Sequence, residues 1–359
     1  MKRIVQLSSL MVLMMVMAAC GSSEGSSSGE VNGDNEKAEH SSTSSSNEPL
    51  TIVWYPNESG ADLKDARDEI GRMVEEAVGR TVEHQTTTDY IIAIEALVNG
   101  NADLAFMGAQ GYIEANLKNE EIQPLVVPSG ASGTLDDAVY YSWIATKKGN
   151  EGEYQEGSEY SIDRIVDKKF SFVSNSSTSG FKVPAEGIIS HFSELSEFTD
   201  LTEDDLIEGG QFFSEVLFGG SHQGAAVNLL TDKADVAAFC DTCVGNYVEI
   251  SEGEENTPGA IYHVKEDAAE PFQAIPGEEF VLLSVTPVLN APFVVNEGTV
   301  SDEEQNKLIE AFESEEMANN ETIFVPSDSE QSGLFTKSED ERFLRVEDAW
   351  FNPIRELSK

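Results

Sequence analysis

Positively charged residues are scarce in this 359-residue chain, where 22 Lys and Arg stand against 66 Asp and Glu and the formal net charge is −44. A surface so acidic argues against binding nucleic acid and against attraction to anionic lipid. Any site for an anion must therefore depend on short-range donors rather than on a basic patch. We interpret the charge as a solvated surface suited to high salt.

Cysteine is also scarce, with only Cys20, Cys240 and Cys243. Two cysteines alone cannot hold zinc. A thioredoxin-type motif would need a helix N-terminus after a strand near the start of a βαβ unit, whereas here the C-x-x-C pair ends an apolar strand and is split by Asp241-Thr242. A local disulfide or two inert thiols are favoured over redox catalysis. The sequence also has no G-x-S-x-G elbow and no Ser/His/Asp set at hydrolase spacing. We predict no catalytic residues, no metal site and no cofactor.

Long apolar runs are absent except at the N-terminus, where Met1-Lys2-Arg3 precedes an apolar stretch that ends Ala18-Ala19-Cys20. This pattern predicts a secretory signal over residues 1–19 and not a membrane span. A cysteine after two small residues resembles a lipobox, so we expect Cys20 to be lipidated. The alternative is an ordinary signal peptide with an incidental cysteine. Loss of the two positive charges at Lys2 and Arg3 would bring the mature chain to −46.

Residues 21–48 are rich in Gly, Ser, Asn and Glu and almost without apolar side chains, so 20–48 is predicted to be a lipidated cysteine with a flexible linker. We expect an extracytoplasmic protein anchored to the cell membrane through this lipid. The folded part is predicted to begin near Leu50.

From Leu50 onward, apolar runs typical of strands alternate with helical periodicity, which predicts an α/β fold with mostly parallel sheets. Predicted strands cover 50–55, 81–84, 102–107, 123–127, 138–146, 170–173, 211–217, 234–239, 260–264, 280–285 and 292–295. Predicted helices cover 61–78, 89–98, 112–117, 161–166, 185–192, 223–230, 241–247 and 302–313. Residues 149–160 and 251–279 are predicted surface excursions, and the tail is predicted to pack back as helix and loop.

The length of the mature chain suits two lobes, predicted as 49–142 plus 283–359 and as 143–282. Ligands of open α/β sheets bind beyond the carboxyl ends of the strands. Two such edges that face each other would form a cleft, and hinge closure around a ligand is the usual motion.

The most informative stretch is the hydroxyl-rich turn at Ser177, Thr178 and Ser179, which lies between a predicted strand and a predicted helix. The first N–H groups of a helix lack partners within it, and the helix dipole places partial positive charge there. Together with three hydroxyls they predict a site for a tetrahedral oxyanion. The alternative is a simple helix cap, for which one hydroxyl is enough.

Other predicted strand ends carry polar side chains that we take as candidate ligand contacts; these are Tyr55, Asn57, Gln110, Tyr112, His222 and Asp241. The alternatives are half-buried aromatics for the tyrosines, a structural role for His222 and a helix cap for Asp241. Glu58 is interpreted as a solvated loop acid. An acid such as Asp241 would repel a fully ionised anion but accept a hydrogen from a protonated phosphonate, phosphite or phosphate, so it would discriminate against sulfate.

The run Ser-Thr-Ser-Gly-Phe-Lys-Val-Pro at 177–184 closely resembles a motif of PhnD-type substrate-binding proteins, which serve ABC importers for phosphonates and phosphite. Residues 103–108 with Tyr112, 220–222 and 233–238 resemble further segments of that family, in the same order. The resemblance implies a two-lobed type II periplasmic-binding-protein fold, with Ser177, Thr178, Ser179 and His222 on the ligand oxygens. Relatives that bind aminoalkylphosphonates tend to carry an acid before a later proline, where this chain has Asn290-Ala291.

We therefore predict a monomeric substrate-binding lipoprotein that delivers a small phosphorus oxyanion to an ABC permease in the membrane. One alternative is a binding protein that signals to a membrane histidine kinase. A third is an enzyme on the same fold, with Cys240 or Cys243 as nucleophile and His222 as base.

Overall fold

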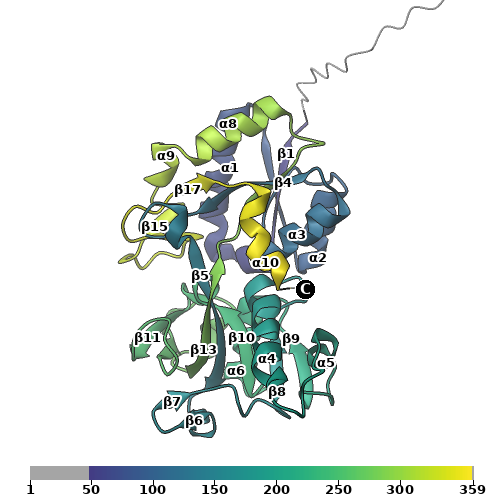
Figure 1. Cartoon of the computed structure of the whole chain (residues 1–359). Helices are drawn as coiled ribbons and strands as arrows, with labels where there is room; N and C mark the ends of the chain where they lie inside the picture. The colour runs from purple at the N-terminus through teal and green to yellow at the C-terminus, as the bar shows by residue number, and fades with distance from the viewer. Residues whose placement is uncertain (1–47, 358–359) are drawn as a thin grey trace, which may run out of the picture. The chain divides into compact units, whose positions relative to one another are not determined.

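The computed structural model describes residues 48–357 (Figure 1). The predicted signal peptide, Cys20 and nearly all of the predicted linker lie outside these residues. None of the helices in the described range is long and apolar enough to cross a bilayer. The described residues belong to one compact unit.

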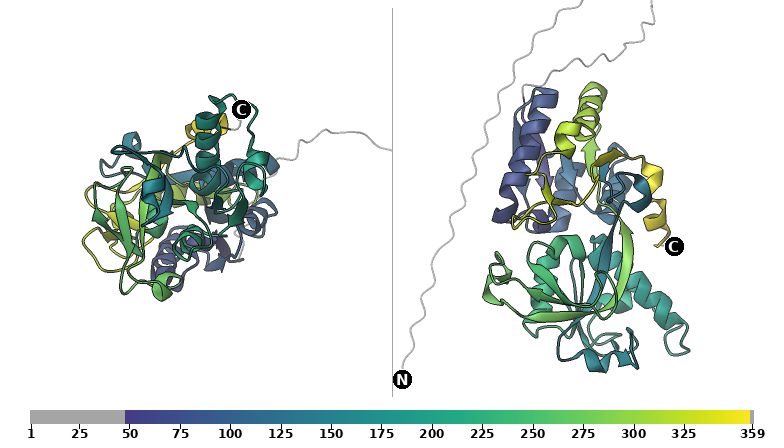
Figure 2. Two further views of the ribbon diagram at one scale, coloured as in Figure 1. Left: turned by 90° about the horizontal axis from the view of Figure 1, so that it is seen from below. Right: turned by 90° about the vertical axis from the view of Figure 1, so that its left-hand side faces the viewer.

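The first sheet has the strand order β17-β4-β14-β3-β1-β2. Its strands are β1 (Leu50–Trp54), β2 (Val82–Thr86), β3 (Leu104–Phe106), β4 (Ile122–Pro128), β14 (Phe293–Asn296) and β17 (Phe343–Arg345). The helices that accompany it are α1 (Lys64–Val78), α2 (Tyr90–Val98), α3 (Ala109–Lys118), α8 (Asp302–Phe312), α9 (Glu315–Ala318) and α10 (Asn352–Glu356). Helices α1 and α8 come from opposite ends of the described chain and lie side by side (Figures 1 and 2).

The second sheet has the order β11-β12-β13-β5-β10-β8-β9. Its strands are β5 (Val139–Lys147), β8 (Lys169–Phe172), β9 (Glu215–Phe218), β10 (Val236–Cys240), β11 (Val248–Glu252), β12 (Ile261–Val264) and β13 (Glu279–Leu289). Its helices are α4 (Val183–Ser193), α5 (Glu203–Ile207), α6 (His222–Leu230) and α7 (Asp241–Val244). Short two-stranded pairs are formed by β6 (Gln155–Glu156) with β7 (Glu159–Tyr160), and by β15 (Phe324–Pro326) with β16 (Phe335–Lys337).

The predicted α/β class and the two-lobed fold are confirmed, but the prediction of mostly parallel sheets is wrong. Strands β1 to β3 are mutually parallel, as are β10, β8 and β9, whereas β14 runs antiparallel to β3 and β4. The long strands β5 and β13 pair antiparallel from Val139 opposite Leu289 to Lys147 opposite Phe280. They run in opposite directions because β5 leads the chain into the second lobe and β13 leads it back.

Local sequence accounts for most helices. The buried face of α1 carries Ala66, Ile70 and Val74 at helical spacing, and Gly79 ends the helix in the left-handed region at φ 76°. Asp89 caps α2 by accepting a hydrogen bond from the Ile91 N–H group.

Two predicted elements are wrong. Residues 161–166 form turns and no helix, because Ile162 and Ile165 are buried in the core from irregular backbone. The run 211–217 is not one strand, since pairing begins at Glu215, whereas Phe212 and Phe213 pack edge-on in an aromatic core cluster. No element was predicted for residues 248–250, and 251–252 belonged to the predicted surface excursion, yet these residues form strand β11 (Val248–Glu252).

Candidate ligand-binding site

A cavity of about 450 Å³ lies where loops of the first sheet face the second. Its walls come from the turn after β1, the ends of β3 and β4, the start of β5, the turns before α4 and α6, and residues 324–336 of the C-terminal part. Six of the nine predicted contact residues line it, namely Tyr55, Asn57, Ser177, Thr178, Ser179 and His222. Gln110, Tyr112 and Asp241 do not.

The hydroxyl-rich turn opens the helix directly. A π-helical turn over Thr178–Lys182 continues into α4, so the helix begins earlier than the predicted 185. Ser177 is its cap, and its Oγ accepts a hydrogen bond of 3.1 Å from the Gly180 N–H group. Thr178 Oγ1 accepts one of 2.9 Å from the Gln110 N–H group at the start of α3. Both hydroxyls therefore keep their own hydrogen free to donate.

Ser179 completes this row of hydroxyls. Its Oγ is buried and has no hydrogen-bond partner within residues 48–357. A buried hydroxyl without a partner costs free energy, so its place in a cavity wall indicates that a ligand or water satisfies it.

His222 is the first residue of α6, and its ring is oriented by the backbone. Its Nδ1 accepts a hydrogen bond of 3.0 Å from the Cys240 N–H group. Burial lowers the pKa of His222 to about 3, so the ring is neutral at pH 7. A neutral ring that accepts at Nδ1 carries its hydrogen on Nε2, which lies 3.4 Å from Ser177 Oγ and acts as a further donor.

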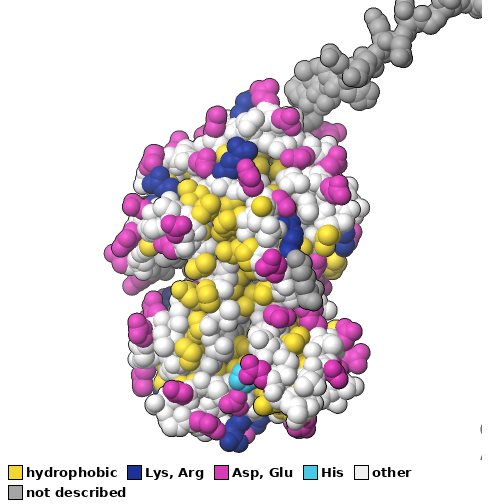
Figure 3. Space-filling view, in the orientation of Figure 1, with side chains coloured by type: hydrophobic (Ala, Val, Ile, Leu, Met, Phe, Trp, Pro, Cys, Tyr) yellow, Lys and Arg dark blue, Asp and Glu magenta, His cyan; other side chains and the backbone are white. Residues whose placement is uncertain are grey.

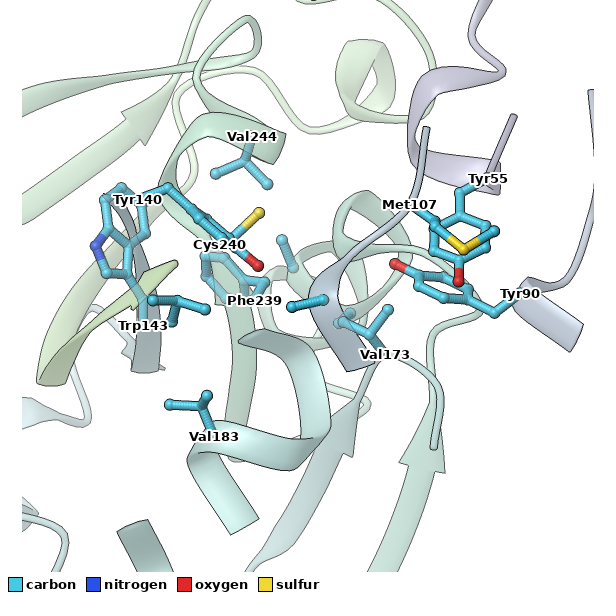
Figure 4. Packing of buried hydrophobic residues seen from close by; sticks show 14 of the residues in the cluster. Tyr55, Tyr90, Met107, Tyr140, Trp143, Val173, Val183, Phe239, Cys240 and Val244 are labelled. Carbon is cyan, nitrogen blue, oxygen red and sulfur yellow. The ribbon is translucent and has the colours of Figure 1, made fainter. Parts of the chain in front are cut away.

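Asn57 joins the turn after β1 to the second lobe. Its Nδ2 donates to the Tyr90 hydroxyl oxygen at 2.6 Å, and its Oδ1 accepts from the His222 N–H group at 3.0 Å. Because the Tyr90 hydroxyl oxygen accepts this hydrogen bond, the hydroxyl hydrogen of Tyr90 remains available to donate. The Tyr55 and Tyr90 rings pack with centroids 4.1 Å apart, and the Tyr55 hydroxyl has no partner in the described part of the chain (Figure 4).

The three remaining predicted contacts have other partners. Gln110 contributes its backbone N–H group to Thr178, while its side chain donates to Glu114. The Tyr112 hydroxyl donates to Asp348, whose carboxylate also accepts from Arg355. Tyr112 therefore links α3 to the C-terminal segment that contains Asp348 and Arg355.

Asp241 Oδ1 accepts a hydrogen bond of 2.9 Å from the Tyr141 N–H group. Burial raises the pKa of Asp241 to about 6. Because this acid lies outside the cavity wall, direct discrimination against sulfate by Asp241 is not supported.

Sequence reasoning missed most of the cavity wall, including Glu58, Tyr90 and Tyr140. Tyr90 follows the helix cap Asp89, so the rule that selected Tyr112 at a strand-to-helix junction would also have found it. Tyr140 lies within β5, and its hydroxyl end points toward that of Tyr90 in Figure 4. Glu58, interpreted as a solvated acid, places a carboxyl oxygen in a buried position.

Cys240 and Cys243 form a disulfide, which confirms one of the two structural alternatives. The sulfur atoms lie near His222, but sulfurs bonded to each other offer no thiolate as a nucleophile or metal ligand. The arrangement gives no support to cysteine-based catalysis.

A double Cys240→Ala, Cys243→Ala variant is expected to lose about 2 kcal/mol of unfolding free energy, because the bridge closes only a short loop. Affinity for the ligand should change little, because the Cys240 N–H group that orients His222 belongs to the backbone. Urea unfolding and calorimetry measure the two effects. A folded double variant that no longer binds would show that the sulfur atoms act in the site itself.

Comparison with known proteins identifies the family. The family model for the periplasmic phosphonate substrate-binding protein of ABC transporters matches residues 52–351. The chain is 27% identical over 197 residues to the phosphate-import protein PhnD of Mycolicibacterium smegmatis, an alignment that covers 55% of this chain and 56% of that protein. The aligned part thus spans about half the length of this relative.

Two solved structures share the fold. One is a binding protein component of an ABC phosphonate transporter from Pseudomonas aeruginosa, with a TM-score of 0.58, 18% identity and coverage of 86% of this chain and 85% of that one. The other is PhnD1 of Prochlorococcus marinus in complex with methylphosphonate, with a TM-score of 0.58, 16% identity and coverage of 87% and 98%. These matches show that the chain belongs to the family of periplasmic phosphonate-binding proteins of ABC transporters, whose members bind substrates for transport and are not enzymes.

Proposed function

We propose that the protein binds a small phosphorus oxyanion in this cavity, a phosphonate, phosphite or phosphate, and delivers it to an ABC permease. One observation carries the proposal: the polar groups around the hydroxyl-rich turn are arranged to donate. Ser177 and Thr178 accept from backbone N–H groups, Tyr90 accepts from Asn57, and each keeps its hydrogen for the cavity. The hydroxyls of Ser179 and Tyr55, which have no partner in the described part of the chain, add further donors.

Such a wall suits an oxyanion, whose oxygens accept several hydrogen bonds each, and it suits a cation poorly. It also explains how a chain with a net charge of −44 can hold an anion, because neutral donors replace a basic patch. Acidic side chains are spread over the visible face of the molecule, and basic ones are few (Figure 3). Lys265 lines the cavity, but its Nζ donates to the carbonyl oxygens of Gly245 and Asn246.

The ligands named for the relatives support the same class, since one is described as a phosphate importer and another was solved with methylphosphonate. We further propose that Cys20 is lipidated and tethers a monomer to the outer face of the cell membrane. We also propose that the two lobes comprise residues 49–142 plus 283–359 and residues 143–282.

Calorimetry on the full chain in detergent tests the function. Methylphosphonate, 2-aminoethylphosphonate, phosphite, phosphate and sulfate would be titrated at pH 7 and high salt. We expect at least one phosphorus oxyanion to bind with a Kd of about 1 μM or below, and sulfate serves as the comparison anion. A folded protein that binds none of the phosphorus compounds would remove the oxyanion assignment and leave only the family and fold.

A further inference from the structure

Glu58 is an acid close to the hydroxyl and imidazole groups that line the cavity around the hydroxyl-rich turn. It lies in the 3-10 turn Pro56–Glu58 that follows β1, and it is one of the residues that line the cavity, together with Tyr55, Tyr90 and His222. Its Oε2 atom is buried and has no hydrogen-bond partner within residues 48–357. A carboxylate in such a position would repel an oxyanion, so its presence requires an explanation.

No cation neutralises this carboxyl group among the described residues. The nearest guanidinium, that of Arg67 in α1, uses Nη1 to donate to the backbone carbonyl oxygens of Glu58 and Gly60. Arg67 therefore holds the backbone of the turn and makes no hydrogen bond to the Glu58 carboxyl oxygens. The described ion pairs include none with Glu58.

The groups that face Glu58 are mostly phenols. Its charge would act on Tyr55 beside it, Tyr90 of α2, Tyr140 of β5 and Tyr247 near the end of α7, and Arg67 supplies the one opposing charge. Burial, the largest influence, raises the pKa of Glu58 to about 8, while hydrogen bonds and Arg67 act in the opposite direction. The group is thus mainly uncharged at pH 7.

We propose that Glu58, in its protonated form, donates its carboxylic hydrogen to an oxygen of the bound oxyanion and so makes affinity depend on pH. The proposal rests on the proposed function and names one more residue for the same site. A protonated acid matches the other neutral donors of the wall, whereas an ionised one would need a cationic group on the ligand. No proton needs to move when the protonated protein binds.

The sign of the pH effect follows from linkage. A bound anion favours the protonated form of Glu58, so binding above pH 8 must take up a proton. Affinity should then be full below about pH 7 and fall by up to about tenfold for each further pH unit above 8. Methylphosphonate also titrates near neutrality, so the effect of Glu58 is the difference between wild type and a variant that cannot ionise.

Glu58→Gln supplies that variant, because its amide has the same shape and keeps a neutral donor at every pH. Titration of methylphosphonate into the full chain in detergent should give similar affinities for both proteins at pH 7 and at least a fivefold weaker one for wild type at pH 9. Calorimetry in two buffers of different ionisation enthalpy should show proton uptake at pH 8.5 in wild type beyond that of the variant. Glu58→Met, of similar size but without a donor, should bind about 10-fold more weakly at pH 7.

Three outcomes would overturn the proposal while leaving the proposed function intact. These are identical pH curves for wild type and Glu58→Gln, undiminished binding by a folded Glu58→Met protein, and a preference for 2-aminoethylphosphonate over methylphosphonate that Glu58→Gln abolishes. The last would show that an ionised Glu58 pairs with an ammonium group. Failure of every variant and of wild type to bind any phosphorus oxyanion would overturn both proposals together.

Discussion

Thr178→Val is expected to weaken binding of the phosphorus oxyanion by about 10- to 100-fold. The two side chains have nearly the same shape, so the change removes the hydroxyl, which also accepts a hydrogen bond from the Gln110 N–H group. Thr178 is buried and donates from an oxygen already held by the Gln110 N–H group, and hydrogen bonds to charged groups contribute about 1.5–3 kcal/mol each. Calorimetry with the best ligand of the panel measures the loss.

Two controls separate this loss from a general effect of the substitution. Thr178→Ser keeps the hydroxyl and should bind almost as wild type does. Thr146→Val makes the same change at another buried threonine, which lies in β5 and outside the cavity. The Thr146 hydroxyl donates to the Asp235 carbonyl oxygen. The substitution should lower stability by about 1 kcal/mol and leave affinity unchanged. Equal affinity of Thr178→Val and wild type would show that this hydroxyl does not contact the ligand.

The hydroxyl-rich turn could be located from sequence because its chemistry is local. Three hydroxyls next to a glycine lie within four residues, and a helix cap needs only neighbouring backbone N–H groups. The same holds for His222 at the start of α6 and for the cap at Asp89.

The partners of Tyr112 and Asp241 could not be predicted from sequence, because the direction of a side chain depends on distant residues. The partner of Tyr112 is Asp348, which is 236 residues away in sequence. Asp241 Oδ1 accepts a hydrogen bond from a backbone N–H group of β5. This strand lies next to Asp241 because β5 pairs antiparallel with β10, which ends just before Asp241. No periodicity in the sequence carries either fact.

Glu58 was expected to lie in solvent, because a charged residue in a Pro/Asn/Ser loop is usually solvated. Its burial results from the way in which the turn after β1 meets α2 and the second lobe, with Asn57 hydrogen-bonded to both Tyr90 and His222.

The prediction of mostly parallel sheets failed because it, too, depended on local pattern alone. Alternating strands and helices predict parallel pairs, but β5 and β13 connect the two lobes and pair with each other.

Gly180→Ala is expected to lower both stability and ligand affinity, which explains why a glycine follows the three hydroxyls. A β-carbon at this position would lie 2.2 Å from Val173 Cγ2 and 2.5 Å from Val173 Cβ. Val173 is fully buried, has a stiff β-branched side chain, and donates its N–H group to the Gly180 carbonyl oxygen at 3.1 Å. The turn must therefore move away from the strand, at a cost of about 1–3 kcal/mol for overpacking.

The same β-carbon would lie 2.8 Å from Ser177 Oγ, so the movement displaces the cap and the hydroxyls that follow it. Gly187→Ala is the matched control, because it lies in the same helix at an exposed position with nothing within 4 Å of the new β-carbon. That change should stabilise the protein by about 0.5–1 kcal/mol, since alanine favours a helix more than glycine does, and should leave affinity unchanged. Urea unfolding should therefore give opposite signs for two identical substitutions seven residues apart. Equal stabilisation by both would mean that the contact with Val173 does not hold the turn against the strand, and the position of the donors would need another explanation.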